Sequence, residues 1–236
     1  MKTRREQYDE LWSGAWGDMQ TFGPVHRHAL ERLVTMVAGL PVQSVLDVGC
    51  GSGQNLRALA ATRTYRLAGI DVSDKALERA HAAVPGAELH RLDVQYEKLE
   101  ARFDLVMSLQ VIEHVPDDLA LIRNMRLMSN RFLILATMQG KMRPSETRIG
   151  HLRNYSSAEL SEKMQSVGLK PIRVEGWGFP FYSPLYRTAA EWLPGGPPDG
   201  PMGRGSRLAA ALLYQLYKLN VTGRGDVITV LAEVND

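Results

Sequence analysis

Short apolar runs alternate with stretches of helical periodicity through the middle of the chain. The run Ser44–Val48 (SVLDV) ends in glycines and is typical of a strand that is buried on both faces of a sheet. Residues 54–61 follow it, with Leu56, Leu59 and Ala60 at helical spacing. The same alternation predicts six further strands, at residues 66–70, 87–92, 103–109, 132–136, 169–174 and 227–234.

Polar residues and prolines mark the starts and ends of the predicted helices. Ser73 is a good N-cap for a helix that ends before Pro85. Pro116 suits the first turn of another helix, and the two aspartates after it suit the positive end of the helix dipole. Ser156 and Glu159 form a capping box for a helix that stops near residue 168.

Strands that alternate with helices indicate the α/β class, with a parallel sheet covered by helices on both faces. The pattern predicts seven strands, and the length of 236 residues suits one domain that spans residues 1–236. The alternation breaks in residues 176–225, where we expect a helical cap insertion between the last two strands. It holds predicted helices at 184–193 and 207–219, and a Gly- and Pro-rich loop at 194–205 that we expect to be mobile.

The first 40 residues form a separate N-terminal element in the pattern. They carry a predicted helix at 28–38 and an aromatic lead-in made of Tyr8, Trp12, Trp16 and Phe22. Aromatic faces attract a cation, so these rings could form a helical lid over a bound ligand that carries a positive charge. The alternative is that they only pack on the core.

Composition indicates an ordinary globular protein. Hydrophobic residues make up 44% and charged residues 23% of the chain, and the net charge of +2 gives no reason to expect a nucleic-acid partner. Cys50 is the only cysteine, so an intrachain disulfide is impossible. The sequence has no apolar run of 18 residues and no apolar leader at its start. We therefore expect a cytoplasmic protein with no transmembrane segment.

The strongest chemical signal is the stretch VLDVGCGSG at residues 45–53. Its glycines, at positions 49, 51 and 53, let the backbone approach a ligand closely at the turn from strand to helix. A dinucleotide site would need glycine at position 54, which is Gln54. Asp47 inside the motif suits a ligand that carries an ammonium group and a carboxylate. A tight turn without any ligand is the alternative.

Acidic residues stand at the carboxyl ends of three successive predicted strands. Asp47, Asp71 and Asp93 are separated by 24 and 22 residues, about one strand–helix unit each. Ligands bind outside the carboxyl ends of strands in such sheets. A carboxylate at Asp71 can accept both hydroxyls of a ribose, and Asp93 can accept from an adenine amino group. For any one of these acids, a helix cap is the alternative.

These motifs resemble the class I S-adenosylmethionine-dependent methyltransferases. The resemblance rests on VLDVGCGSG, on GIDVS at 69–73, on LDV at 92–94 and on FDLVMSLQVIEHV at 103–115, and it covers about residues 40–175. It implies a Rossmann-like, mostly parallel sheet of seven strands whose last strand is antiparallel, and S-adenosyl-L-methionine as the cofactor. The implied cofactor-binding residues are Asp47, Gly49, Cys50, Gly51, Gly53, Asp71, Val72, Asp93, Val94 and Gln110.

The resemblance also implies a role for most of these residues. Gly49 and Gly51 line the methionine moiety of the cofactor and Asp47 helps to hold it, while Asp71 takes the ribose. Asp93 and Val94 take the adenine, and Gln110 sits near the sulfonium.

The stretch EHVPD at residues 113–117 is similar to the ubiquinone-biosynthesis O-methyltransferases and their small-molecule relatives. In those enzymes an acid three residues before Glu-His can join a divalent-metal site. That position is Gln110 here, and a neutral amide is a poorer ligand for a hard cation, so we expect no metal. His114, with Glu113, is the candidate catalytic base. A helix-start histidine satisfied by its neighbours is the alternative.

The acceptor pocket is expected after the fifth strand. In related small-molecule enzymes this loop faces the acceptor, which makes His151, Arg153 and Tyr155 (in GHLRNY) candidate substrate residues. Trp177 begins an aromatic stretch, WGFPFYSPLY, that could roof a flat or apolar acceptor. The alternatives are an exposed polar loop for the first segment and packing of the insertion on the sheet for the second.

The sequence therefore favours an S-adenosylmethionine-dependent methyltransferase that methylates an oxygen of a small molecule. N- or C-methylation and a non-catalytic cofactor-binding partner protein stay open. A base-methylating enzyme is not favoured, because the segment after the fourth strand reads SLQVIE and not Asn/Asp-Pro-Pro-Tyr. The predicted helix at 207–219 is apolar on nearly all sides, so we expect it to cap the acceptor pocket and to help form a homodimer.

Overall fold

The computed structural model describes residues 4–13, 16–192 and 202–235. The chain divides into two compact units, and we describe each by itself. The first unit comprises Met1–Leu92 with Pro197–Leu219, and the second comprises Asp93–Gly196 with Asn220–Asp236.

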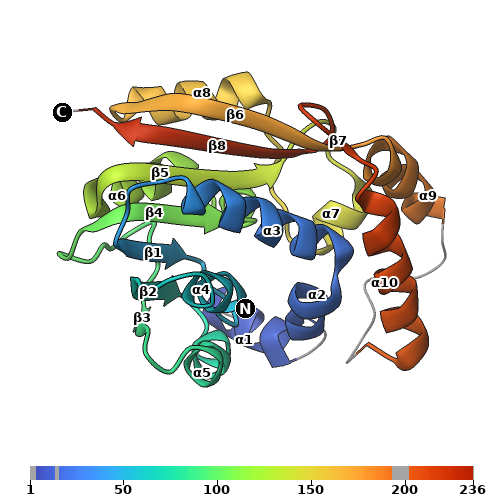
Figure 1. Cartoon of the computed structure of the whole chain (residues 1–236), viewed down its shortest axis with the longest axis horizontal. Helices are drawn as coiled ribbons and strands as arrows, with labels where there is room; N and C mark the ends of the chain where they lie inside the picture. The colour runs from blue at the N-terminus through green and yellow to red at the C-terminus, as the bar shows by residue number, and fades with distance from the viewer. Residues whose placement is uncertain (1–3, 14–15, 193–201, 236) are drawn as a thin grey trace. The chain divides into compact units, whose positions relative to one another are not determined.

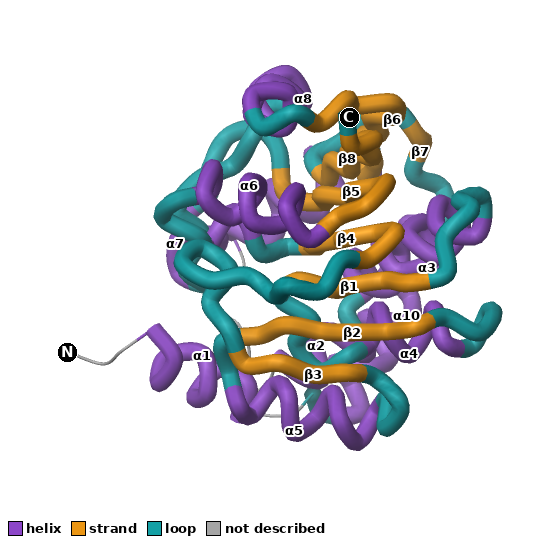
Figure 2. Tube along the Cα trace, turned by 90° about the vertical axis from the view of Figure 1, so that its left-hand side faces the viewer, coloured by secondary structure: helices purple, strands orange, loops and turns teal. Residues whose placement is uncertain are grey.

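The first unit holds three parallel strands, with β2 in the middle (Figure 2). They are β1 (Ser44–Val48), β2 (Arg66–Asp71) and β3 (Glu88–Arg91). Asp47 of β1 lies in register with Gly69 of β2. The side chains of β1 after Ser44 are all buried, as the unbroken apolar run predicts.

Six helices complete the described part of this unit. They are α1 (Arg4–Ser13), α2 (Trp16–Phe22), α3 (Pro24–Ala38), α4 (Gln54–Ala60), α5 (Asp74–Ala83) and α10 (Arg204–Tyr217). Ser73 caps α5, since its hydroxyl accepts the Ala76 N–H at 3.1 Å. This confirms the N-cap predicted from the sequence, and α5 ends before Pro85 as expected.

Helix α10 packs against α3 (Figure 1). The ring of Tyr214 stacks on His28 with centroids 4.6 Å apart, and its hydroxyl bonds Glu31. The side of α10 that faces its own unit carries the buried residues Ala210, Tyr214 and Tyr217. The opposite side of the helix is exposed in the chain, and it carries Leu208, Leu212, Leu216 and, just beyond the helix, Leu219.

The second unit holds five strands in the order β4-β5-β8-β6-β7. They are β4 (Phe103–Leu109), β5 (Ser129–Met138), β6 (Leu169–Phe179), β7 (Val221–Thr222) and β8 (Val227–Val234). Strands β4 and β5 are parallel, and β8 is antiparallel to both β5 and β6. The last strand in the chain, β8, is therefore antiparallel to its neighbours, as the resemblance implies.

Helices and short turns connect these strands. They are the 3₁₀ turn η1 (Ile112–His114), α6 (Asp118–Met128), α7 (Pro144–Arg148), α8 (Ser157–Ser166), the irregular turn η2 (Phe181–Tyr186) and α9 (Arg187–Trp192). Helix α8 lies along β6 (Figure 1). Ser156 caps α8, since its hydroxyl accepts the Glu159 N–H at 3.1 Å, as predicted.

The described residues form eight strands, which corrects the predicted count of seven. Strand β6 was expected to end at residue 174, but it runs to Phe179 because β8 pairs with it as far as Trp177. The extra length gives the two residues of β7 a partner, with Trp177 opposite Thr222 and Phe179 opposite Val221. Gly176 pairs with Ile228 of β8, whereas Gly178 has a φ of +120° and lies at an irregularity in the pairing of β6 with β7.

The helix boundaries near the predicted insertion also differ. The expected helix at 184–193 is replaced by η2 followed by α9, and α10 begins at Arg204 and not at 207. Residues 194–201 of the predicted mobile loop lie outside the described residues. Helix α6 begins at Asp118 and is capped by Asp117, so Pro116 precedes it. Within the described parts of the chain, each helix is too short or too polar to cross a bilayer.

A buried ion group ties the start of α9 to the rest of the second unit. The guanidinium of Arg187 pairs with the carboxylates of Glu146 and Asp226, and Nη1 also donates to the Gln139 carbonyl at 3.4 Å. The side chain is only 5% exposed, so water cannot replace these partners. Removing the guanidinium would leave two carboxylates, one of them buried, without a cationic partner.

We predict that Arg187→Met lowers the free energy of unfolding by about 3–5 kcal/mol, because it leaves these carboxylates without their cation. Urea denaturation followed by circular dichroism measures the change. Arg66→Met is the control, since the Arg66–Glu88 pair is about half exposed and its loss should cost less than about 1 kcal/mol. Equal losses in the two variants would contradict the prediction.

Candidate functional site

The glycine turn after β1 is closed by its own hydrogen bonds. The N–H groups of Gly49 and Cys50 both donate to the Ile70 carbonyl, at 2.7 and 3.0 Å, and the Gly53 N–H donates to the Cys50 carbonyl at 2.9 Å. The Gly51 N–H donates to a carboxylate oxygen of Asp71 at 2.9 Å. These four groups do not point at a phosphate, which agrees with the departure from the dinucleotide motif.

Position 51 tolerates only glycine. Its φ of +54° lies in the left-handed region, and an added Cβ would lie 2.6 Å from the Trp12 ring. Trp12 is buried on α1, and Gln20 on α2 accepts the Ser52 hydroxyl proton at 2.8 Å. The N-terminal helices therefore lie directly on the glycine turn. These contacts do not test the predicted role of the N-terminal helices as a lid, which stays a prediction.

Asp71 links the end of β2 to the glycine turn. One carboxylate oxygen accepts the Gly51 N–H and the other accepts the Ser73 N–H, each at 2.9 Å. The side chain is buried, and burial raises the pKa of Asp71 while these backbone bonds lower it. Each oxygen keeps a second lone pair for a ligand hydroxyl. Val72 follows it and is partly buried.

Asp47 is a fully buried acid in β1. Its Oδ2 accepts from the Asn55 amide at 3.1 Å, but its Oδ1 has no hydrogen-bond partner. Burial raises the pKa of Asp47 to about 7. A bare buried carboxylate oxygen is unfavourable unless a donor reaches it, so it marks a place for a ligand's ammonium group.

Cys50 points away from such a ligand. An added Cβ at Gly69 would lie 2.8 Å from its Sγ, so the thiol packs on β2. Burial raises the pKa of the thiol well above its ordinary value, which makes it unreactive. Only the backbone of Cys50 belongs to the turn.

Asp93, Val94 and Gln110 belong to the second unit. Asp93 Oδ1 accepts the Gln95 N–H at 3.1 Å, and the Val94 carbonyl accepts from the Asn124 amide at 2.7 Å. Gln110 has a φ of +58°, and it is the non-glycine residue with positive φ among the described residues. Such a backbone costs about 1–2 kcal/mol, and residues held in it cluster at functional sites. The motif pattern did not reveal this feature.

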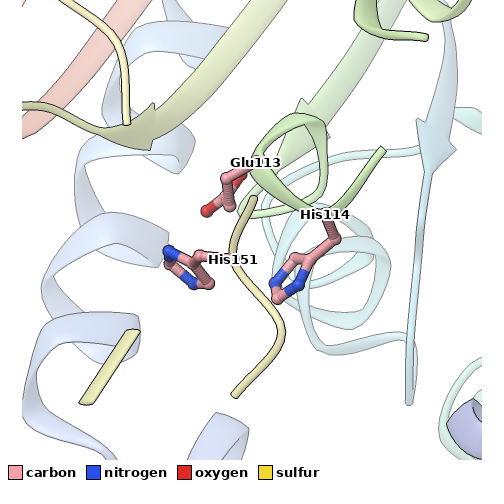
Figure 3. A group of neighbouring side chains, drawn as sticks. All are labelled: Glu113, His114 and His151. Carbon is pink, nitrogen blue, oxygen red and sulfur yellow. The ribbon is translucent and has the colours of Figure 1, made fainter. Parts of the chain in front are cut away.

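Three polar side chains converge beyond the end of β4 (Figure 3). Glu113 and His114 come from η1, and His151 comes from the loop after α7. Each offers one ligand atom, and these atoms lie within 4.8 Å of one another. The rings of His114 and His151 meet edge to face with centroids 4.6 Å apart. The predicted catalytic pair and one predicted acceptor residue are thus brought together.

Burial sets the charges of this cluster. Glu113 is fully buried: its Oε2 accepts the Thr137 hydroxyl proton at 2.8 Å, and its Oε1 has no partner. Burial raises the pKa of Glu113 to about 7 and lowers the pKa of His151 to about 4. His151 is therefore neutral near neutral pH.

The hydrogen bond that His114 makes indicates which of its ring nitrogens carries the proton. Its Nδ1 lies 3.1 Å from the Gly150 carbonyl, which can only accept, so the neutral ring carries its proton on Nδ1 and its lone pair on Nε2. Two imidazoles and a carboxylate also form a donor set that divalent cations can use. The expected absence of a metal stays a prediction.

Arg153 and Tyr155 anchor the loop that carries His151. Arg153 donates to Asp118 and to the Pro116 carbonyl, both at 3.0 Å. The buried Tyr155 hydroxyl donates to the same Asp118 carboxylate at 2.8 Å. Both side chains therefore hold residues 150–155 against the start of α6.

Trp177 is buried in β6. Its ring stacks on Tyr182 of η2 with centroids 6.0 Å apart. This contact is the packing that the sequence offered as an alternative to an aromatic roof.

Comparison with known protein families finds a match for part of the chain. Residues 45–129 match the protein family described as a methyltransferase domain. We refer to this matched segment, residues 45–129, as the methyltransferase domain. It contains the glycine turn, Asp71, Glu113 and His114, whereas His151 lies beyond its matched end.

Curated relatives extend the match. The chain is 31% identical over 128 residues to the ubiquinone biosynthesis O-methyltransferase of Nitrosomonas europaea, which covers 50% of this chain and 54% of that protein. It is 27% identical over 215 residues to the 27-O-demethylrifamycin SV methyltransferase of Amycolatopsis mediterranei, which covers 79% and 78%. The match thus spans about half the length of the ubiquinone enzyme.

Among solved structures, the chain resembles the magnesium protoporphyrin IX methyltransferase of Synechocystis PCC 6803 with bound SAH. The TM-score is 0.59 at 18% identity, over 89% of this chain and 84% of that one. The methyltransferase domain therefore belongs to an α/β, Rossmann-like methyltransferase fold.

We predict that Asp47 makes the stability of the methyltransferase domain depend on pH. The folded chain keeps the Asp47 proton up to about pH 7, whereas the unfolded chain loses it near its ordinary pKa of 3.8. The contribution of Asp47 to the free energy of unfolding therefore falls as the pH rises between these values. Asp47→Asn should remove that part of the fall.

Urea denaturation at about pH 5 and about pH 7 measures the difference. Glu97→Gln, at an exposed position, is the control and should keep the wild-type slope. An unchanged slope in Asp47→Asn would show that Asp47 titrates alike in both states.

Proposed function

We propose that this protein is an S-adenosylmethionine-dependent methyltransferase that transfers the methyl group to an oxygen of a small-molecule acceptor. The observation that carries the proposal is the glycine turn of the methyltransferase domain, with its half-satisfied Asp47 and its anchored Asp71. The relatives named ubiquinone biosynthesis O-methyltransferase and 27-O-demethylrifamycin SV methyltransferase support oxygen as the target.

The residues present suit the cofactor. The bare Oδ1 of Asp47 can accept from an ammonium group, and the remaining lone pairs of Asp71 can accept ribose hydroxyls. In this proposal Gly49, Gly51, Gly53 and the backbone of Cys50 and Val72 line the cofactor, Asp93 and Val94 take the adenine, and Gln110 lies near the sulfonium. The bound cofactor supplies an activated methyl group.

The protein must then remove a proton and orient the acceptor. A hydroxyl becomes a better nucleophile as its proton leaves, and the Nε2 lone pair of His114 can take that proton. Glu113, whose carboxylate is held by the Thr137 hydroxyl, is a second group beside His114 that can accept a proton. We propose His114 and Glu113 as the catalytic pair and His151 as an acceptor-binding residue, with Trp177 as part of the roof and Arg153 and Tyr155 acting through the loop they hold.

The larger organisation is proposed on the same basis. Residues 1–40 act as a lid, supported by the contact of Trp12 with the glycine turn, and residues 176–225 cap the acceptor pocket within one methyltransferase domain of residues 1–236. The homodimer, the absence of a nucleic-acid partner and the cytoplasmic location stay predictions from the sequence. N- or C-methylation and a non-catalytic partner protein are the alternative functions, since the fold alone does not fix the chemistry.

The test is methyl transfer from labelled S-adenosylmethionine to a panel of small hydroxyl, amine and carbon acceptors. Label in an alkali-stable ether product supports the proposal, while label on nitrogen or carbon selects an alternative. The Asp71→Ala variant should bind the cofactor about tenfold more weakly in calorimetry, because ribose hydroxyls would lose their acceptor. Asp74→Ala, at the exposed start of α5, is its control. No heat of binding by the wild-type protein would refute the cofactor assignment.

We predict that His114→Gln lowers kcat by about 100-fold and leaves cofactor affinity nearly unchanged, because the variant removes the proton acceptor but keeps the volume. Steady-state kinetics with saturating cofactor measure the effect. His81→Gln, on the exposed side of α5, is the matched control and should keep the wild-type kcat. A kcat within about twofold of wild type would mean that another group takes the proton.

A further inference from the structure

Aromatic contacts join the first two helices to each other and to the glycine turn. Trp12 of α1 is 3% exposed and occupies the space that a Cβ at position 51 would need. Its ring meets Trp16 of α2 edge to face with centroids 5.9 Å apart, and Tyr8 meets Trp16 at 6.2 Å. Such ring pairs pack favourably, so α1 and α2 lie on the turn together.

A polar contact joins α1 to the residue that caps α5. Asp9 Oδ1 accepts the Ser73 hydroxyl proton, with 2.5 Å between the two oxygens, and the Lys75 N–H donates to the same oxygen at 3.3 Å. Ser73 is fully buried, and its backbone N–H donates to Asp71 Oδ1 at 2.9 Å. A hydroxyl has one proton, so the proton that Ser73 gives to Asp9 is not available to Asp71.

A second polar contact joins α2 to the glycine turn. Gln20 Oε1 accepts the Ser52 hydroxyl proton at 2.8 Å, and Ser52 is 5% exposed. The residue before it, Gly51, donates its N–H to Asp71 Oδ2 at 2.9 Å. The side chain next to this donor is therefore also held by an N-terminal helix.

Both N–H groups that orient the Asp71 carboxylate thus lie at residues in contact with α1 or α2. Ser73 is itself one donor, and Ser52 follows the other donor, Gly51. A carboxylate that accepts two hydroxyls of one ligand needs both oxygens in fixed directions. Groups that hold its backbone donors in place therefore support its affinity for that ligand.

We propose that Asp9 and Gln20 are positioning residues for Asp71. By holding the hydroxyls of Ser73 and Ser52, they fix the carboxylate that accepts the vicinal hydroxyls of a ribonucleoside. Packing of α1 and α2 on the turn and binding of the ribose then stabilise one another, because such a coupling is reciprocal. This inference rests on the proposed function and adds to it the residues that tie the N-terminal helices to cofactor affinity.

Calorimetry with S-adenosylhomocysteine tests the two contacts. Asp9→Ala and Gln20→Leu should each weaken binding about fivefold, because each removes the acceptor of one buried serine hydroxyl. The two variants act at different serines, so either one tests the proposal if the other does not fold. Wild-type affinity in the folded variants overturns it.

Two further variants on α1 serve as controls. Asp9→Asn keeps an acceptor oxygen for Ser73 and should bind within about twofold of the wild-type affinity. Glu10→Gln, at an exposed position of the same helix, should bind like the wild-type protein. Binding by Asp9→Asn that is as weak as that of Asp9→Ala overturns the role of the hydrogen bond to Ser73.

A double-mutant cycle separates positioning of Asp71 from plain support of the fold. Asp9→Ala should cost about fivefold in affinity in the wild-type background and nothing further in the Asp71→Ala background, if it acts through Asp71. An equal loss in both backgrounds shows that Asp9 acts independently of Asp71, and it overturns the proposal.

Hydrogen exchange tests the reciprocal effect without changing α1 or α2. Binding of S-adenosylhomocysteine to the wild-type protein should slow amide exchange in both helices. The slowing should be absent in Asp71→Ala saturated with the same ligand. Unchanged exchange in α1 and α2 when the wild-type protein binds overturns the coupling.

Failure of the proposed function would look different. The wild-type protein would bind S-adenosylhomocysteine with the expected dependence on Asp9 and Gln20, and yet transfer no methyl group. If this inference alone fails, methyl transfer and cofactor binding persist and the Asp9 and Gln20 variants bind like the wild-type protein. Absence of any binding by the wild-type protein overturns both.

Discussion

Each compact unit buries one carboxylate with only half of its hydrogen bonds made. Asp47 in β1 and Glu113 in η1 each use one oxygen within the chain and leave the other bare. Such groups are unfavourable in an apolar core, so the surrounding strands must stabilise the fold without them. The raised pKa of each acid, about 7, has the same origin. A ligand that brings a hydrogen-bond donor to either bare oxygen supplies the partner that the core lacks.

Hydrogen bonds to neighbouring segments hold the loop at residues 150–155 in one orientation. Tyr155 and Arg153 fasten its far end to Asp118, and Glu146 holds Asn154 and the backbone of His151. A ring with two different nitrogens needs this support, because a change of tautomer exchanges a donor for an acceptor.

The first unit shows a different use of packing. Helices α1 and α2 lie on the glycine turn, where Trp12 takes the space that a Cβ at position 51 would need. Helix α10 turns Tyr214 toward α3 and leaves its leucines exposed in the chain. The apolar residues of this helix therefore form one face that packs within the unit and a second face that is exposed.

The sequence by itself determined the elements whose signals are local. Ser44–Val48, Phe103–Leu109 and Val227–Val234 have the predicted bounds, and Ser73 and Ser156 cap helices as expected, because periodicity and capping act within a few residues. The motifs also named Asp47, Asp71, Glu113 and His114 as functional candidates. Strand β7, the length of β6 and the positive φ of Gln110 depend on partners distant in the chain, so only the tertiary structure decided them. The same holds for the meeting of His151 with Glu113 and for the contact of Asn154 with Glu146, since packing, not local preference, brings separate segments together.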